Sequence, residues 1–191
     1  MASDDIKKQC LESFGGWIGS LAGDIGVLME VVKDGSAPRA SREAAASGIN
    51  YLFKSLDLIP DGIDDIGYLD DAFTVRVAAK FTMKAGAGKV GVKSQERIGQ
   101  LATDVDLLVG LLGEDLYQRF ETYVDKLRLG AARGRMVSEI LDDAANLLEF
   151  DAEVAQFCKD YQAPEFHKDE KNLIKLAAFF DAKLPRDSRM P

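Results

Sequence analysis

The chain has 191 residues, of which 47% are apolar and 29% are charged, and its formal net charge is −8. A chain of this length and composition folds as one large soluble domain or two small ones, and it needs no disulfides or metals to bury a core. Its acidic surplus excludes a general attraction to phosphate backbones, so we expect no nucleic acid partner.

The first predicted element is one long helix over residues 6–33. Gly15, Gly19 and Gly23 recur on one of its faces, four positions apart. Glycine lowers helix propensity, so a row of glycines needs a compensating contact. We interpret the row as a surface for close helix packing inside the domain. The alternative is a helix that lies on a membrane surface or meets a partner.

Two more helices follow in the first part of the chain. The second begins at Pro38, a residue suited to the first turn, and ends before Pro60, because the residue preceding a proline avoids helical geometry. The third covers residues 68–85 and is apolar on more than one face. That pattern predicts the central, most buried helix of the fold.

The later residues keep the helical pattern. Residues 86–94 contain Gly and Lys but lack the spacing of a phosphate-binding loop, so we interpret them as a linker. Residues 95–112 form a strongly amphipathic helix. Asp151 and Asp169 are the expected N-caps of two later helices. Apolar residues expected to face inward in the last three helices include Leu147, Leu148, Val154, Phe157, Tyr161, Leu173, Ile174, Ala177 and Phe180.

We therefore predict an all-α protein with six to seven helices in a compact bundle, with two packed helical subdomains as one arrangement of it. Residues 1–86 would form a helical domain around an acidic helix–loop–helix. Residues 95–184 would form a C-terminal helical bundle, and residues 185–191 a frayed tail. A single domain is the alternative.

Residues 55–71, SLDLIPDGIDDIGYLDD, hold six aspartates and no lysine or arginine. Carboxylates this close repel one another, and a buried one without a partner is costly, so something must satisfy them. We expect a structural motif or an acidic docking patch here. Its residues are Asp57, Pro60, Asp61, Gly67, Asp70 and Asp71.

Three explanations of these aspartates remain open. In the first, the carboxylates cap turns and the start of the third helix, where the helix dipole favours negative charge. In the second, some of them bind Ca²⁺ or Mg²⁺. The ligands would then be Asp57, Asp61, Asp70 and Asp71. In the third, they dock onto lysine or arginine of another protein or of this chain, where the internal partners would be Arg39, Arg42 or Arg76.

The stretch DLIPD, followed nine residues after its last aspartate by DD, resembles the signature of the YkvA-like family of bacterial domains of unknown function. The resemblance covers residues 44–80, about a fifth of the chain. Leu56 and Asp64 stand where the signature has prolines. The resemblance implies a helix–loop–helix in a bacterial protein and carries no established chemistry. The matching residues are Ser55, Asp57, Leu58, Ile59, Pro60, Asp61, Ile63, Gly67, Asp70 and Asp71.

The sequence offers no recognisable catalytic set. His167, Cys10 and Cys158 form neither a nucleophile–base pattern nor a zinc pattern. We therefore expect a non-catalytic helical interaction or scaffold module that binds a protein partner or a second copy of itself. A divalent-metal-binding protein with a regulatory or hydrolytic role is one alternative, and a peripheral membrane protein is another.

Cofactor content and location follow from the same residues. We expect no resident cofactor unless the aspartates bind Ca²⁺ or Mg²⁺. Two unpaired cysteines indicate a reducing compartment, and the first residues lack the apolar core of a signal peptide. The expected location is the cytoplasm.

Overall fold

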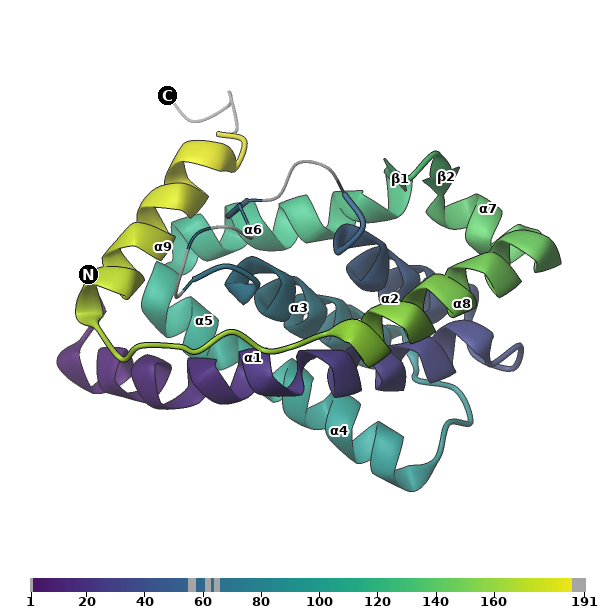
Figure 1. The fold of residues 1–191 in the computed structure, drawn as a ribbon, viewed down its shortest axis with the longest axis horizontal. Coiled ribbons are helices and arrows are strands. Elements are labelled where there is room, and N and C mark those ends of the chain that lie inside the picture. The colour runs from purple at the N-terminus through teal and green to yellow at the C-terminus, as the bar shows by residue number, and fades with distance from the viewer. Residues whose placement is uncertain (1, 55–57, 61–62, 64–65, 187–191) are drawn as a thin grey trace.

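The computed structural model describes residues 2–54, 58–60, 63 and 66–186, and within them it confirms the all-α prediction (Figure 1). A short turn of 3-10 helix, η1 (Leu127–Leu129), leads into two very short strands, β1 (Ala131–Ala132) and β2 (Arg135–Met136). The α-helices are α1 (Asp4–Lys33), α2 (Arg39–Tyr51), α3 (Leu69–Ala85), α4 (Val92–Thr103), α5 (Val105–Leu112), α6 (Glu114–Lys126), α7 (Val137–Asp142), α8 (Ala144–Asp160) and α9 (Glu170–Lys183).

α1 is the longest helix. It begins where the Ser3 hydroxyl accepts a hydrogen bond from the Ile6 amide, and Asp4 and Asp5 complement the dipole of the first turn. Fully burying one large apolar side chain stabilises a fold by ~1.5–3 kcal/mol, so the inner face of α1 is a main source of stability. That face carries Cys10, Phe14, Trp17, Ile18, Leu21, Ile25, Leu28, Met29, Val31 and Val32.

α1 is also long and apolar enough to cross a membrane by length and composition alone. Half of its most apolar window is buried inside the fold, and core helices of soluble proteins meet the same criterion. Asp24, which is 1% exposed, lies on the buried side of this helix. The peripheral-membrane alternative stays a prediction.

α3 occupies the centre of the bundle, as its apolar pattern predicts. Twelve of its 17 residues are buried. In Figure 1 it lies between α1 and α6, and it also packs against α2, α4 and α5. α2 approaches it very closely at Gly48, where an added Cβ would overlap the Cβ of Ala78.

The chain after α8 returns along α1. In Figure 1 the connecting segment from α8 to α9 runs beside α1 for much of its length. The Tyr161 hydroxyl donates to the Ile18 carbonyl at 3.0 Å, and the rings of Phe166 and Phe14 lie 6.2 Å apart. The described buried apolar side chains form one cluster that draws on both halves of the chain. Whether residues 1–86 and 95–184 fold as one domain or two stays a prediction.

Three predicted helix boundaries differ from the structure. The second helix is predicted to end just before Pro60, but α2 ends at Tyr51. The helix expected over residues 95–112 is divided at Asp104 into α4 and α5, and the Asp104 carboxylate accepts a hydrogen bond from Arg76. The expected N-cap Asp151 lies inside α8, where it pairs with Lys33. The N-cap of α8 is Asp143, whose carboxylate accepts hydrogen bonds from the amides of residues 145 and 146 at 2.8 and 2.9 Å.

The glycine row of α1 does not act as predicted. A Cβ at Gly19 or Gly23 would meet no atom within 4 Å among the described residues. A Cβ at Gly15 would make ordinary contact with Phe166 at 3.6 Å. The close-packing interpretation is therefore wrong for Gly19 and Gly23, because these two glycines lie on the exposed side of α1 rather than between helices.

Candidate functional site

The acidic motif lies between α2 and α3. Asp57, Asp61, Asp64 and Asp65 fall outside the described residues, so the predictions for Asp57 and Asp61 stay predictions. The later acids of the motif, Asp70 and Asp71, stand in the first turn of α3, where the helix dipole favours negative charge. Pro60 is exposed, and Gly67 is buried.

Asp70 ties the two helices together from the inside. Its Oδ2 accepts hydrogen bonds from the Tyr51 hydroxyl at 2.6 Å and from the Ile59 amide at 3.0 Å. The Tyr51 oxygen in turn accepts from the Leu58 amide at 2.9 Å. Burial raises the pKa of Tyr51 far above its usual range, and the charge of Asp70 raises it further, so the hydroxyl stays protonated as a donor. Asp70 thus fixes the bend between α2 and α3.

The bend ends in a strained residue. Tyr68 has φ 65°, a left-handed conformation that costs a non-glycine residue ~1–2 kcal/mol. Its carbonyl accepts the Ala72 amide at 3.0 Å, which starts α3. The conformation directs the Tyr68 ring toward Tyr161, with the two centroids 5.5 Å apart in an edge-to-face arrangement.

A cleft of about 670 Å³ opens beside this bend. We call it the aromatic–acidic cleft. Its walls come from the end of α2, the start of α3, the hairpin turn between β1 and β2, and the C-terminal half of α8. Its aromatic residues are Phe53, Tyr68, Phe157 and Tyr161, and its charged residues are Asp71, Arg133, Glu153 and Asp160.

The four rings form a continuous row. Phe53 and Phe157 are 6.4 Å apart, Phe157 and Tyr161 are 5.3 Å apart, and Tyr68 closes the row against Tyr161. The Tyr161 hydroxyl is held by the Ile18 carbonyl of α1. The row is therefore anchored to α1, α3 and α8, so the cleft is formed before any ligand binds.

Carboxylates outnumber cations in the lining of this cleft, with three against one. Asp71 is 3% exposed and belongs to the predicted acidic motif. Asp160 is exposed at the end of α8 and accepts from Gln156 at 2.5 Å. Glu153 pairs with Arg135 through Oε2 and lies 3.8 Å from Arg133 through Oε1. The combination of ring faces with carboxylates is suited to a cation.

The sequence indicates this site through acidic residues that share a helix face with aromatic residues. Glu153, Phe157 and Asp160 are spaced by four and three positions, and the C-cap Tyr161 follows Phe157 by four, so they share one face at the C-terminal end of α8. Periodicity alone assigns Phe157 and Tyr161 to the core. Acids at the neighbouring positions of the same face are the sign that this face meets water or a ligand instead.

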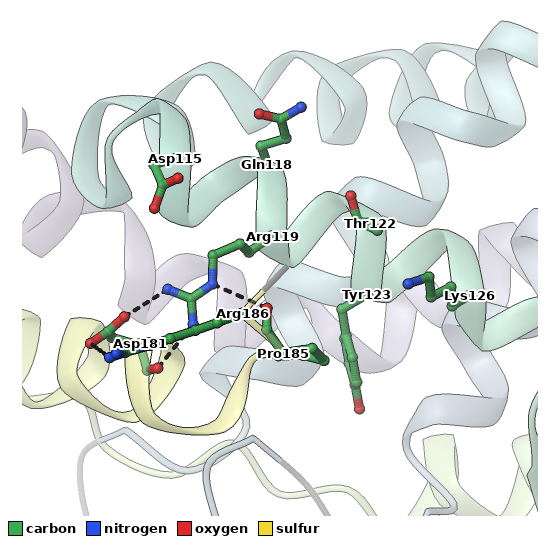
Figure 2. A pocket seen from close by; sticks show the side chains of 9 residues that line it. All are labelled: Asp115, Gln118, Arg119, Thr122, Tyr123, Lys126, Asp181, Pro185 and Arg186. Carbon is green, nitrogen blue, oxygen red and sulfur yellow. Dashed lines mark hydrogen bonds and ion pairs between the residues drawn. The ribbon is translucent and has the colours of Figure 1, made fainter. Parts of the chain in front are cut away.

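A second pocket, of about 420 Å³, lies between α6 and the end of α9 (Figure 2). Figure 2 shows Arg119 reaching Asp181, where the guanidinium donates to the carboxylate at 2.6 Å and to the backbone carbonyl at 3.0 Å. The same side chain donates to the carbonyl of Leu184 at 2.8 Å. Arg119 lowers the pKa of Asp181. Because Arg119 satisfies the last carbonyls of α9, we interpret this pocket as a helix-end clamp.

A buried ionic cluster links α1, α3 and α4. Arg76 is fully buried, donates from Nε to Asp104 at 2.9 Å, and lies 3.9 Å above the ring of Trp17. Asp24 accepts from Arg97 at 2.7 Å and lies 3.9 Å from Arg76 Nη2. Burial lowers the pKa of Arg76 to about 10, and the charge of Asp104 opposes that shift, so Arg76 is charged at neutral pH.

The predicted internal partners of the acidic motif make other contacts. Arg76 serves the ionic cluster, Arg39 pairs with Glu43 and Asp142, and Arg42 donates to the Val32 carbonyl. No group of three His, Cys, Asp or Glu side chains that could hold a metal ion occurs among the described residues. Since Asp57 and Asp61 lie outside them, the Ca²⁺ or Mg²⁺ hypothesis stays a prediction.

The chain matches no protein-family model, and neither a curated protein nor a solved structure shows significant similarity to it.

Proposed function

We propose that this protein is a non-catalytic interaction module that binds a basic side chain of a partner protein in the aromatic–acidic cleft. The observation that carries the proposal is the row of ring faces beside Asp71, Glu153 and Asp160. A cation above an aromatic face gains ~0.5–1 kcal/mol at an exposed site and ~2 kcal/mol or more when it is desolvated. The exposed carboxylate of Asp160 and the partly exposed carboxylate of Glu153 add attraction and orientation.

The charge of the whole chain supports the same partner chemistry. A net charge of −8 attracts a basic segment over a distance and raises the rate of encounter. The cleft then selects a basic side chain, since its carboxylates repel an acidic one and would be desolvated without a partner by an apolar one. Tyr68 and Asp71 of the acidic segment, residues 55–71, also line the cleft. The proposal therefore gives this part of the acidic motif a role in binding the partner.

The proposal is tested by binding of a fluorescent peptide rich in arginine and lysine, measured by fluorescence anisotropy. We expect Asp160→Lys to weaken binding by about tenfold or more, equivalent to ~1.4 kcal/mol. Asp160 is the last residue of α8, where a cation suits the helix dipole, so the variant should fold normally. Phe157→Leu should also weaken binding, because it keeps an apolar side chain but removes the ring face.

The matched control is Glu96→Lys on α4, an exposed position with no part in the cleft. It makes the same change in net charge as Asp160→Lys, so it measures the general electrostatic effect. Equal losses in the two variants would show that the peptide follows net charge and not the cleft. Absence of peptide binding to the natural chain at low salt would reject the proposal.

A further inference from the structure

The hairpin turn between β1 and β2 carries an arginine into the aromatic–acidic cleft. β1 and β2 pair antiparallel, with Ala132 opposite Arg135, so the turn consists of Arg133 and Gly134. Both turn residues have positive φ, 48° and 79°. Asn, Asp and Gly are the residues that favour this conformation at both turn positions, and arginine is an uncommon choice.

The guanidinium of Arg133 occupies a position that a ligand cation would take. Its Cζ lies 4.6 Å from the centroid of the Phe53 ring, and its Nη1 lies 3.8 Å from Oε1 of Glu153. We call this place, between the Phe53 ring and Glu153 Oε1, the cation position of the cleft. The Arg133 side chain is 56% exposed, and its distance to Glu153 is longer than a hydrogen bond, so it is held weakly.

Arg135 holds Glu153 in place from the other side. Its side chain is 10% exposed, and it pairs with Oε2 of Glu153 and with Glu149 at 3.0 Å. Glu153 therefore keeps a fixed orientation with Oε1 facing the cleft, whether or not Arg133 is present. The cation position is thus built by Phe53, which is 8% exposed, and by Glu153, whose side chain is 23% exposed. Its present occupant, Arg133, is 56% exposed and loosely paired.

We propose that Arg133 is an internal ligand of the cleft, and that an arginine side chain of the partner displaces it from the cation position. This inference rests on the proposed function. A planar guanidinium can stack on the Phe53 ring and meet Glu153 with its edge at the same time, whereas the compact ammonium of lysine satisfies one contact at a time. The contact of Arg133 is autoinhibitory, since an occupied site lowers the apparent affinity in proportion to its occupancy.

The test is the variant Arg133→Asn, with an oligoarginine and an oligolysine peptide of equal length as probes. Asparagine tolerates the positive φ and forms the favoured Asn-Gly turn, so the hairpin should persist while the internal guanidinium is lost. We expect the oligoarginine peptide to bind about threefold or more tightly to Arg133→Asn than to the natural chain. The gain for oligolysine should be smaller.

The control is Arg128→Asn, which removes the same charge from an exposed arginine of η1 outside the cleft. Equal gains in the two variants, or weaker binding by Arg133→Asn, would overturn the inference. The proposed function would survive that result as long as Asp160→Lys still weakens peptide binding selectively. If the natural chain and all variants bind neither peptide, the proposed function fails and the inference fails with it.

Discussion

Two arginines of this protein lie over aromatic rings beside carboxylates, and they differ in exposure. Arg76 lies 3.9 Å above Trp17 in the centre of the bundle and is fully buried. Arg133 lies 4.6 Å above Phe53 at the mouth of the aromatic–acidic cleft, and its side chain is 56% exposed. The chemistry is the same, but burial makes the first arginine a fixed part of the fold and leaves the second free to exchange.

The physical reason is the environment of each charge. Arg76 is fully buried, so its charge is compensated by Asp104 and Asp24, and removing these carboxylates would leave a buried charge without compensation. Around Arg133 water can take over from Glu153 at little cost. A ligand can therefore compete for the second site, while the first is closed to it.

The largest expected effect comes from removing the buried arginine. Arg76→Ala should lower the free energy of unfolding by ~3–5 kcal/mol, because it removes the ion pair with Asp104, leaves buried Asp24 with Arg97 as its remaining cation, and uncovers Trp17. Arg133→Ala should lower it by less than ~1 kcal/mol. Urea unfolding followed by circular dichroism measures both values. Similar losses of unfolding free energy in Arg76→Ala and Arg133→Ala would show that burial does not distinguish the two arginines. Arg76→Met removes the charge but keeps an apolar side chain, so it separates the effect of lost packing from that of lost charge.

A smaller effect is expected at the wall of the cleft. Tyr51→Phe removes the hydroxyl that donates to Asp70 and accepts from the Leu58 amide. The buried Leu58 amide then loses its hydrogen bond, while Asp70 keeps the bond from the Ile59 amide. The free energy of unfolding should fall by ~1–3 kcal/mol. Peptide binding should weaken as well, since the same bend positions Tyr68 and Asp71.

Tyr123→Phe is the matched control for Tyr51→Phe. The Tyr123 hydroxyl accepts from Lys54 at 3.2 Å in a partly exposed place, where water can replace it. We expect a loss below ~1 kcal/mol there, since a replaceable hydrogen bond contributes little. A loss at Tyr123 equal to that at Tyr51 would mean that burial beside Asp70 is not what makes Tyr51 important.

The positions of the central helices could be predicted from the sequence because they depend on local patterns. The apolar pattern predicts helices over residues 6–33 and 68–85, and α1 and α3 span Asp4–Lys33 and Leu69–Ala85. The same patterns do not say how wide the buried stripe of a peripheral helix is. The pattern places Leu148 and Ile174 inside, but they are 71% and 70% exposed, because α8 and α9 lie at the edge of the bundle.

The candidate site was harder to predict because its parts come from distant segments. The acidic motif predicts a role for Asp70 and Asp71, and the structure places them in different surroundings. Asp70 accepts the hydrogen bonds that fix the bend between α2 and α3, while Asp71 lines the cleft. Arg133 and Glu153 carry no motif, and only the folded chain brings them to Phe53. The buried ionic cluster could not be predicted from the sequence either, because no local pattern links Arg76 with Asp104 and Asp24.

The smallest expected effect concerns the stability of the hairpin itself. Arg133→Asn should leave the free energy of unfolding unchanged or raise it by up to ~1 kcal/mol, because asparagine accepts positive φ more readily than arginine does. The lost contact with Phe53 and Glu153 offsets part of this gain. Arg128→Asn, at a position without positive φ, should give no gain. A clear loss of stability in Arg133→Asn would show that Arg133 holds the hairpin in place. In that case Arg133 would resemble Arg76 more than an exchangeable occupant, and the distinction between the two arginines would rest on exposure alone.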